Sequence, residues 1–515
     1  MKLEVLLEEV EVLSCTGDLS VEINNLACDS REVSPGGLFF AIPGRQQDGR
    51  SFIDDAEKRG AAAIIGPGGR TLSKGCVSVE VKDIRKAMAL TACRFYGNPS
   101  RDLSLIGVTG TNGKTTFTYL LEAILTHAGF YPGVIGTIRY RYLECTRSPR
   151  TTTPESIDLQ KLLREMANRG ITHVVMEVSS HGIDLQRVYG CHFRCGVFTN
   201  LTRDHLDYHG TMENYFASKA RLFTEVLPAF NGMKPVALIN IEDPYGRRLR
   251  EMSRVDTRSF HSKGPADYWI DEVAYSSKGI ALTMRTPSGT IALTSPLLSE
   301  ANAQNILAAG ATACSLGINH DAIAQGISAM DSVPGRLEKV WQGDGFAVIV
   351  DYAHTPDALE RVLSSLRSLT AGRLITVFGC GGDRDKGKRP LMGAAAARLS
   401  DVVIVTSDNP RSEPPEQIIQ EILQGVQAQD IPYRKPTQLI ASSIVGKTYT
   451  SEVDRREAIH LAVKMAREGD LVIIAGKGHE EVQIIGGTSH PFRDHDEVIS
   501  AVTSLRRRGL SMCMS

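Results

Sequence analysis

Short apolar runs alternate with longer amphipathic stretches along the middle of the chain. Residues 115–127 have the length and pattern of a helix. The runs typical of buried strands are residues 103–108, 174–178, 195–199 and 236–240. Strands that alternate with helices in this way predict a parallel, doubly wound sheet.

The same alternation begins again near Trp341 and predicts a Rossmann-like domain. Its predicted strands are residues 347–350, 374–378, 402–406 and 471–475. Residues 333–336, which contain Pro334 and Gly335, are the expected hinge before this domain.

The first hundred residues carry two shorter apolar segments, 38–42 and 61–65, with a helix expected at 54–59. This pattern predicts a small α/β unit, and residues 98–101 form the expected linker after it. We therefore predict an α/β protein of three domains. They are a small N-terminal α/β domain at 1–100, a central P-loop-type parallel-sheet ATPase domain at 101–335 and a C-terminal Rossmann-like domain at 336–515.

Composition narrows the class of protein. Hydrophobic residues make up 42% and charged residues 23% of 515 residues, and the formal net charge is -1. Such a balance gives no overall field that would attract nucleic acid or an anionic membrane. Residues 1–10 contain acids where a secretory signal would be apolar, and no apolar run is long enough to span a bilayer. We expect a cytoplasmic protein that works as a monomer.

The ten cysteines are scattered and form no CxxC pair. Cys191 and Cys195 flank His192, which allows a metal site, but no second pair lies nearby in the sequence. Buried thiols are the favoured interpretation.

The strongest chemical signal is the segment TGTNGKTT at residues 109–116, between the predicted strand 103–108 and the predicted helix. Glycines let backbone amides turn toward a ligand, and a helix N-terminus adds positive potential, so phosphate oxygens find a site there. Lys114 would reach the β- and γ-phosphates, and Thr115 would offer its hydroxyl to Mg²⁺. A structural glycine turn is the alternative. The general P-loop template also places a glycine where Val108 stands, so this loop departs from it.

TGTNGKTT resembles the signature of the Mur ligase family, the ATP-dependent amide-forming enzymes of peptidoglycan precursor synthesis. Further blocks in the same order resemble that family, spread over nearly the whole chain. They are DSR at 29–31, TTP at 152–154, EVSSH at 177–181, TNLTRDHLDYHG at 199–210, DYAHTP at 351–356, GCGGDRDK at 379–386, DNPR at 408–411 and AGKGHE at 475–480.

The resemblance implies a cytoplasmic ATP-dependent acid–amino acid ligase of cell-wall synthesis. ATP would activate a substrate carboxylate as an acyl phosphate, and an amine would then attack it to form an amide, ADP and phosphate. The expected substrates are UDP-N-acetylmuramoyl-L-alanyl-D-glutamate and meso-2,6-diaminopimelate. Phosphoryl transfer depends mainly on positioning and on neutralising the spreading negative charge, which Mg²⁺ can do.

The resemblance places Thr115, Glu177, His205 and Lys219 at the metal ions, with Lys114 beside them as a catalytic residue. Glu177 ends a predicted strand and His205 follows the next one, so both would lie at the carboxyl edge of the sheet. From residue type alone, a structural ion pair is the less favoured alternative for Glu177, whereas a lone histidine such as His205 is more often structural until the TNLTRDHLDYHG context is considered. Lys219 resembles the family lysine that carries a CO₂-derived carbamate, which turns a cation into an anion. Without that resemblance it would be assigned to a helix surface.

For the nucleotide, the resemblance implies contacts from the loop residues Gly110, Thr111, Asn112, Gly113, Lys114, Thr115 and Thr116. It adds Asn302 and Asn305 on the adenine side, and Arg336 and Asp351 toward the phosphates and ribose. The family has glycine where Ser299 stands. A helix N-cap is the alternative for each asparagine.

For the UDP-sugar peptide, the residues that resemble family contacts are Ser30, Thr152, Thr153, Ser179 and Arg187. Hydroxyls and amides bind a diphosphate without net charge, and Arg187 offers a bidentate fork. Leu185 stands where other members have glutamine.

For the incoming amine, the resemblance implies the residues Arg384, Asp408, Asn409, Pro410, Arg411, Gly476 and Glu480. Diaminopimelate is lysine with an extra carboxylate, and an arginine matches a carboxylate in a planar, paired geometry. Arg411 would be that arginine, and Glu480 suits the ammonium end. A solvent-exposed loop arginine is the alternative for Arg411.

Other functions stay open at this level. Arg411 argues against a lysine-adding ligase, and the DSR, VSSHG and DNPR blocks argue against a folate-polyglutamylating one. A P-loop NTPase or kinase would use ATP without ligation. A non-catalytic nucleotide-binding scaffold fits worst, because Lys114, Glu177, His205 and Lys219 are all present.

Overall fold

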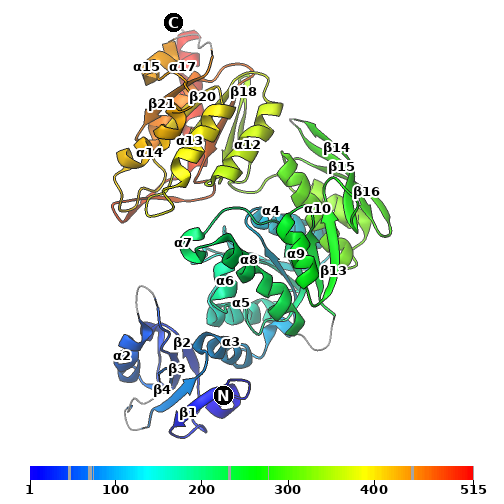
Figure 1. Ribbon diagram of the computed structural model, residues 1–515, viewed down its shortest axis with the longest axis vertical. Coiled ribbons are helices and arrows are strands. Elements are labelled where there is room, and N and C mark those ends of the chain that lie inside the picture. Colours follow the sequence, from blue (N-terminus) through cyan, green and yellow to red (C-terminus); the bar gives the residue numbers. More distant parts are fainter. Residues whose placement is uncertain are drawn as a thin grey trace.

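The computed structural model contains three sheet-based units that follow one another along the chain and along the long axis of the molecule (Figure 1). It describes residues 1–44, 48–67, 72, 75–229, 234–276, 278–441 and 446–513, with only the backbone described at 441 and 508–513. The predicted α/β architecture with three units is confirmed.

The N-terminal unit is a five-stranded sheet in the order β1-β5-β4-β3-β2, parallel except for the pairing of β1 with β5. Leu38 and Phe40 on β3 pack against Met88 of α3 in its core. Its strands are β1 (Val12–Thr16), β2 (Asn25–Ala27), β3 (Gly37–Phe40), β4 (Ala61–Ile65) and β5 (Val77–Val81). Its helices are α1 (Leu3–Leu6), α2 (Ile53–Lys58) and α3 (Ile84–Phe95), with short 3₁₀ turns at η1 (Ser30–Glu32), η2 (Gly49–Phe52) and η3 (Pro99–Arg101).

The central unit is built on an eleven-stranded sheet in the order β16-β15-β14-β13-β12-β11-β6-β10-β7-β8-β9. The strands β6 (Ser104–Thr109), β10 (His173–Glu177), β11 (Phe193–Phe198) and β12 (Val236–Asn240) are parallel, as the apolar runs predicted. The remaining strands are β7 (Pro132–Ile135), β8 (Tyr140–Tyr142), β9 (Cys145–Arg147), β13 (Asp256–His261), β14 (Tyr268–Ser276), β15 (Gly279–Thr286) and β16 (Gly289–Ser295).

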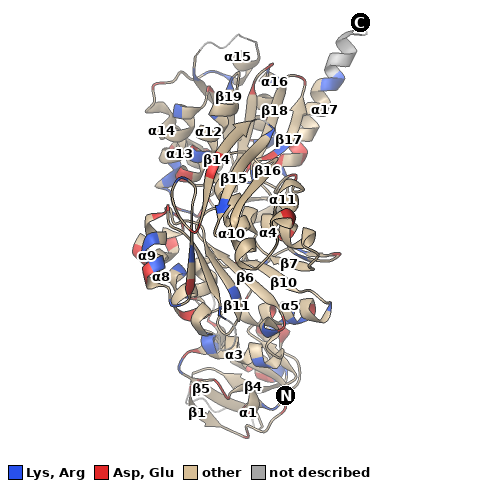
Figure 2. Cartoon of the chain, turned by 90° about the vertical axis from the view of Figure 1, so that its right-hand side faces the viewer, with Lys and Arg blue, Asp and Glu red and all other residues tan. Residues whose placement is uncertain are grey.

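Helices cover both faces of this sheet because alternate residues of the buried strands point to opposite sides. Ile106 and Val108 of β6 pack into the layer that includes α4, α10 and α11, while Leu105 packs into the layer on the other face. Figure 2 shows α4, α10 and α11 close together, in agreement with their mutual contacts. The helices of this unit are α4 (Lys114–His127), α5 (Ser156–Asn168), α6 (Ser180–Asp184), α7 (Leu206–His209), α8 (Met212–Arg221), α9 (Pro244–Met252), α10 (Glu300–Ser315) and α11 (His320–Ser328), with η4 (Leu222–Val226) and η5 (Leu227–Ala229) after α8.

The C-terminal unit has a six-stranded sheet in the order β17-β18-β22-β19-β20-β21, parallel except for β17, and a separate hairpin of β23 and β24. Its strands are β17 (Glu338–Gly343), β18 (Phe346–Asp351), β19 (Leu374–Phe378), β20 (Val402–Thr406), β21 (Thr448–Glu452), β22 (Leu471–Ala475), β23 (Val482–Ile485) and β24 (Thr488–Pro491). Its helices are α12 (Pro356–Leu369), α13 (Lys388–Leu399), α14 (Pro415–Gln427), α15 (Pro436–Ala441), α16 (Arg455–Met465) and α17 (Asp494–Cys513).

The junctions between the sheets lie where the sequence suggested linkers. β5 ends at Val81, α3 and η3 follow, and β6 begins at Ser104. Between the second and third sheets, Val333 and Arg336 form an isolated bridge around a turn, and β17 begins at Glu338. The domain limits of 1–100, 101–335 and 336–515 stay predictions.

No helix in the described part of the chain is long and apolar enough to cross a membrane. Lysine, arginine, aspartate and glutamate are interspersed along all three units (Figure 2). Any site for an anionic ligand must therefore be built from local groups, as the net charge of -1 already indicated.

Candidate active site

The loop that joins β6 to α4 contains two glycines in backbone conformations that other residues rarely adopt. Gly110 has φ of 148° and Gly113 has φ of 88°. A Cβ atom on Gly110 would lie 1.9 Å from Oγ1 of Thr199, and one on Gly113 would lie 2.3 Å from Oδ1 of Asn305. The glycines thus let the loop pack closely between the end of β11 and helix α10.

Asn200, just past β11, holds this loop in place. Its carbonyl accepts from the amide of Thr111 at 2.9 Å, and its Oδ1 accepts from the amide of Asn112 at 2.9 Å. Thr199 Oγ1 donates to the carbonyl of Asn112 at 2.7 Å. Because those two loop amides are engaged, the first turn of α4, whose N–H groups have no partner within the helix, is the part of the loop best able to receive phosphate oxygens.

Two lysines converge on the same loop. Lys114 Nζ donates to the carbonyls of Gly110 and Thr111, each over 2.9 Å, and Lys219 Nζ from α8 donates to the carbonyl of Gly110 at 2.9 Å. Lys219 is 1% exposed, so the alternative of a helix-surface lysine is excluded. Burial, with the charge of Lys114 added to it, holds the pKa of Lys219 well below its usual value.

Glu177 ends β10 and lies buried beside the first turn of α4. Thr115 Oγ1 donates to its Oε1 at 3.0 Å, while Thr137 donates to Oε1 from its amide at 3.0 Å and to Oε2 from its hydroxyl at 2.9 Å. No salt bridge within 4.0 Å holds this carboxylate in the part of the chain that the structure describes, so the structural ion pair is excluded there. Thr137 had not been identified from the sequence.

His205 follows β11 and has a left-handed backbone with φ of 53°. Its ring lies 5.0 Å from that of His181, centroid to centroid, and its Nε2 is 3.5 Å from Oδ2 of Asp204. The side chain of His205 is 46% exposed, and desolvation by the groups around it lowers its pKa to about 4, so its imidazole is neutral near pH 7 and has a lone pair for a metal. Among the described residues, no group of three His, Cys, Asp or Glu side chains could hold a metal by itself.

Eight of the eleven predicted nucleotide residues line one cavity of about 120 Å³ between the central and C-terminal units, whereas Gly110, Thr111 and Lys114 do not. Arg336 reaches back to Thr115, with Nη2 3.4 Å from Oγ1, and lies over the ring of Tyr352 at 4.7 Å. The predicted contacts among the lining residues are Asn112, Gly113, Thr115, Thr116, Asn302, Asn305, Arg336 and Asp351.

The two asparagines of α10 are not helix caps. Ser299 is the N-cap and accepts from the amide of Asn302, with φ of 89° where the family has glycine. Asn302 Nδ2 donates to the carbonyl of Leu298 at 2.8 Å, and Asn305 Nδ2 donates to Oδ1 of Asn302 at 3.0 Å. Asp351 accepts from the amides of Leu337 and Ala353, both at 2.7 Å. The carboxylate therefore also braces the interdomain turn.

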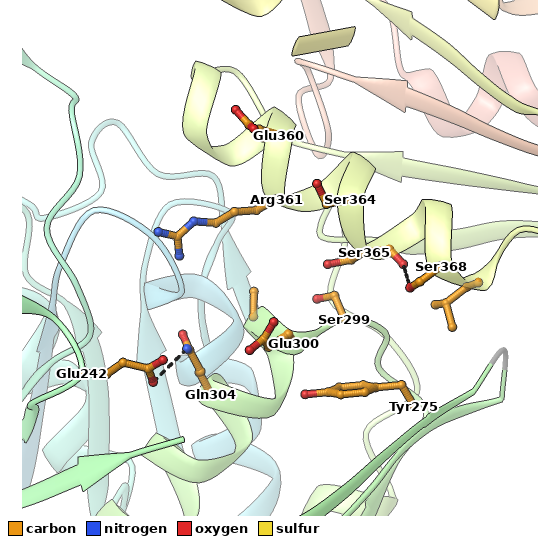
Figure 3. Close-up of a pocket in the computed structure, with 12 residues that line it drawn as sticks. Glu242, Tyr275, Ser299, Glu300, Gln304, Glu360, Arg361, Ser364, Ser365 and Ser368 are labelled. Carbon is orange, nitrogen blue, oxygen red and sulfur yellow. Dashed lines mark hydrogen bonds between the residues drawn. The ribbon is translucent and has the colours of Figure 1, made fainter. Parts of the chain in front are cut away.

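A second, larger cavity of about 460 Å³ adjoins the nucleotide cavity and shares five lining residues with it: Ser299, Ala301, Gln304, Arg361 and Ser365. Figure 3 shows its wall of serines on α12 facing Tyr275 and Glu300. Gln304 donates to Oε2 of Glu242 at 3.2 Å on the opposite side. None of the predicted site residues borders this cavity.

The residues expected to bind the UDP-sugar peptide form a hydroxyl-rich group next to β10. Thr153 Oγ1 donates to the carbonyl of Glu177 at 2.9 Å and lies 3.1 Å from Oγ of Ser179. Thr152 Oγ1 lies 3.1 Å from Oγ1 of Thr137. Arg187 forms an ion pair with Glu155, with 2.6 Å between Nε and Oε1, and its Nη1 donates to the carbonyl of Thr153 at 2.9 Å. Part of the Arg187 guanidinium is therefore already engaged within the protein.

Ser30 belongs to the N-terminal unit and is buried. Glu32, two residues further on, lies 3.6 Å from Arg150, which precedes the threonines of residues 151–153. This ion pair brings the N-terminal unit to the edge of the same group of residues.

A third cavity, of about 380 Å³, lies between the segment around His205 and the C-terminal unit. It is where the predicted amine-binding residues meet the metal-side residues. The predicted site residues that line it are His205, Arg384, Asp408, Asn409, Arg411, Gly476 and Glu480. Asp204, His354 and Lys388 also line it and had received no role from the sequence, although the quoted motifs include Asp204 and His354.

Arg411 is half-buried and has φ of 54°. Its Nη1 donates to the carbonyl of Gly382 at 2.8 Å, and within the described residues it forms no ion pair. Its other guanidinium nitrogens remain for a carboxylate. Gly476 has φ of 113°, and a Cβ atom there would lie 2.5 Å from Oδ2 of Asp408, so a larger residue would close this end of the cavity.

The thiols of Cys191 and Cys195 are buried, and burial raises the pKa of each to about 12. Cys191 accepts a hydrogen bond from Gln160 at 3.1 Å. The interpretation as buried thiols is confirmed.

Family models match three successive segments of the chain. The model described as the Mur ligase family, catalytic domain, matches residues 22–96, the Mur ligase middle domain matches 108–313, and the Mur ligase, glutamate ligase domain, matches 335–478. These segments contain the loop at 109–116, both lysines and the residues of the interdomain cavities except Glu480, which lies two positions past the last matched residue.

Similar proteins include UDP-N-acetylmuramoyl-L-alanyl-D-glutamate--2,6-diaminopimelate ligases from Geobacter metallireducens and Geobacter sulfurreducens. The first is 48% identical over 99% of this chain and 100% of its own length. The second is 48% identical over 98% of this chain and 99% of its own length. A solved structure of a ligase with the same name is 34% identical, covers 98% of this chain and 99% of its own, and has a TM-score of 0.69. MurF ligase from Thermotoga maritima in complex with ADP, at 19% identity and a TM-score of 0.63, shares the fold.

Proposed function

The chain belongs to the Mur ligase family, and we propose that it joins meso-2,6-diaminopimelate to the D-glutamate of UDP-N-acetylmuramoyl-L-alanyl-D-glutamate at the expense of ATP. The main support for this proposal is that two ligases named for this activity are 48% identical to this chain over nearly its whole length. The cavity lined by Arg411, Glu480 and His205 agrees with it.

ATP would bind with its phosphates at the first turn of α4 and its base toward α10. Lys114, whose Nζ donates to the carbonyls of Gly110 and Thr111 in this structure, would reach the β- and γ-phosphates, and Thr115 and Thr116 would add hydroxyls. Asn302 and Asn305 would face the adenine, and Arg336 and Asp351 would approach the phosphates and ribose from the C-terminal unit. The loop residues proposed to contact the nucleotide are Gly110, Thr111, Asn112, Gly113, Lys114, Thr115 and Thr116.

The donor set beside the loop fits Mg²⁺ if Lys219 is modified. Thr115 and Glu177 supply hard oxygens, and the neutral imidazole of His205 lies on the adjoining segment. The depressed pKa of buried Lys219 favours a neutral amine, the form that adds CO₂ to become a carbamate anion. Bound Mg²⁺ would neutralise phosphate charge, while Lys114 and the α4 N-terminus supply the protein's own positive potential.

In the first chemical step, a carboxylate oxygen of the D-glutamate bonds to the γ-phosphorus and the bond to ADP breaks, giving an acyl phosphate. In the second, the amine nitrogen of diaminopimelate bonds to the acyl carbon, phosphate leaves with the electron pair, and the nitrogen loses a proton. The protein's task is to bring three substrates together with their reacting atoms aligned.

The three units would divide the substrates among them. Residues 1–100 would bind the UDP-sugar together with Thr152, Thr153, Ser179 and Arg187, with Ser30 as the N-terminal contact. Residues 101–335 would bind ATP, and residues 336–515 would bind the amino acid. The protein would work as a cytoplasmic monomer that binds these small molecules.

The amino-acid pocket supports diaminopimelate over lysine. Arg411 has free guanidinium nitrogens for the distal carboxylate, and Arg384 borders the same cavity. Asp408, Asn409 and Pro410 form the turn that carries Arg411, and Gly476 and Glu480 close the other side. Lysine lacks the distal carboxylate that would pair with the guanidinium of Arg411.

The test measures phosphate release with ATP and the UDP-muramoyl dipeptide, comparing meso-diaminopimelate with L-lysine. We expect release that depends on both the dipeptide and diaminopimelate, with little from lysine. Equal release without any amine would favour an NTPase, and preference for lysine would assign the protein to a different member of the family.

A further inference from the structure

Lys477, in the AGKGHE segment after β22, is a charged side chain with no exposure to solvent. Its Nζ donates to the carbonyl of Val482 at 2.7 Å, to Oε2 of Glu480 at 2.8 Å and to Oδ1 of Asn409 at 3.1 Å. An ammonium has three protons, so all of them are engaged inside the protein. Lys477 is therefore not free to contact a substrate itself.

The bond to Asn409 determines which way that side-chain amide points. Lys477 can only donate, so the oxygen of the amide must face it, and Oδ1 also accepts from the amide of Ile484 at 2.9 Å. The amide nitrogen then faces Glu480 and donates to Oε2 at 2.7 Å. Lys477 thus ties the DNPR turn, the AGKGHE turn and β23 into one network.

Both hydrogen bonds to Glu480 are made to the same oxygen, Oε2. Within the described residues no protein group donates to Oε1, although Glu480 lines the 380 Å³ cavity together with Asn409 and Arg411. One carboxylate oxygen is therefore fixed by the protein and the other remains for a ligand.

The charge of Lys477 also stabilises the ionised form of Glu480. Burial raises the pKa of Glu480, the nearby carboxylate of Asp408 raises it further, and Lys477 acts in the opposite direction. The other charged or titratable groups that interact with Glu480 are Tyr352 and Arg455. Removing the ammonium would leave the half-buried carboxylate of Glu480 beside that of Asp408 without the cation that it contacts at 2.8 Å.

We propose that Lys477 is a positioning residue for the incoming amino acid, which holds Glu480 and Asn409 so that Oε1 of Glu480 receives an ammonium group of the diamino acid. This inference rests on the proposed ligation of diaminopimelate. It assigns a specificity role to a side chain that touches no substrate.

Lys477→Met tests this, because it keeps the length of the side chain and removes the charge. The Michaelis constant for diaminopimelate should rise about tenfold or more, while those for ATP and the UDP-muramoyl dipeptide stay within about twofold. Lys447→Met is the matched control, since Lys447 lies in the same unit and donates to the carbonyls of Ala397 and Arg398 on α13, away from the cavity. It should leave all three constants unchanged.

A double-mutant cycle with Glu480→Gln separates positioning from general support of the fold. If Lys477 acts through Glu480, the double variant should use diaminopimelate about as poorly as Glu480→Gln alone. Fully additive losses would contradict the inference. Lys477→Gln is measured in parallel with Lys477→Met. If both variants melt at a lower temperature and raise all three Michaelis constants together, Lys477 has a merely structural role and the inference is overturned.

The wild-type control distinguishes failure of the proposed ligation from failure of the role of Lys477. Wild-type protein that does not ligate diaminopimelate would overturn the proposed function and this inference with it. Wild-type ligation combined with an unchanged Michaelis constant for diaminopimelate in Lys477→Met would overturn the role of Lys477 alone.

Discussion

The ammonium groups of Lys114 and Lys219 donate to one and the same oxygen, the carbonyl of Gly110, each over 2.9 Å. Two cations this close repel each other, and burial adds to the cost of charging Lys219. A carbamate on Lys219 would replace this repulsion with attraction to Lys114 or to a metal.

Lys219→Ala should therefore nearly abolish turnover, and a short carboxylic acid such as formate should restore part of it by supplying the missing anion. Ligation rates with and without added formate give the measurement. Lys161→Ala, at an exposed position of α5, is the control and should keep wild-type rates with no response to formate. Full activity in Lys219→Ala would contradict the role of this lysine.

Arg411→Ala should weaken the use of diaminopimelate by about 10²-fold or more, since a buried carboxylate would lose its charged partner. Steady-state kinetics with varied diaminopimelate provide the check. Arg456→Ala, on the exposed side of α16, removes the same group from the same unit and should change nothing. An unchanged Michaelis constant for diaminopimelate in Arg411→Ala would defeat the assignment.

Apolar patterning predicted the parallel strands because strands buried on both faces are continuous apolar runs. The loop between β6 and α4 was predicted from the TGTNGKTT motif instead. The strands β13 to β16 were missed, of which β13 pairs in parallel and β14, β15 and β16 form an antiparallel meander. In β15, for example, Ile280 and Leu282 are buried while the residues between and after them are partly exposed, so the run is broken by solvent-facing positions. Such alternation is weaker evidence than an unbroken run.

The site residues could be named from motifs, but their contacts depend on the tertiary fold. The burial of Lys219 follows from Tyr215, Phe216 and Ala220, which share the inner face of α8 with it. The approach of Arg336 to Thr115 joins residues 221 positions apart. Ser299 replaces the asparagines as the cap of α10, a result that required backbone angles.

Ser299 has φ of 89° and ψ of 152°, a region that is costly for any residue but glycine. Its capping bond to the amide of Asn302 is long, at 3.4 Å. Ser299→Gly should therefore raise the free energy of unfolding of the central unit by about 1 kcal/mol, because relief of strain outweighs the lost cap. Ser299→Ala loses the cap and keeps the strain, so it should be destabilising. Denaturant melts that rank the two variants in the opposite order would contradict this.

The ion pair of Arg455 and Asp494 is completely buried and bidentate, with both N···O distances at 2.7 Å. Arg455 also donates to the carbonyl of Ala475, directly before Gly476 of the amine cavity. Asp494→Ala should destabilise the C-terminal unit by about 3 kcal/mol, since it leaves an unpaired buried cation. Asp344→Ala, which breaks the exposed pair with Arg506, is the matched control and should have a much smaller effect. Equal shifts of the denaturation midpoint in the two variants would contradict this.

His479 gives the protein a dependence of stability on pH. Burial, with the charges of Arg336, His354 and Lys477 added to it, lowers the pKa of His479 to about 3. The unfolded chain binds this proton near pH 6.5, whereas the folded protein does not until about pH 3. The stability that neutral His479 gives the folded protein is therefore fully present above pH 6.5. It is lost as pH falls, by up to about 1.4 kcal/mol per pH unit. In His479→Gln the unfolding free energy should fall less steeply between pH 6 and pH 4, by up to about 1.4 kcal/mol per pH unit. His490→Gln, on the exposed strand β24, should keep the wild-type slope. Equal slopes in all three proteins would show that His479 is already protonated when folded.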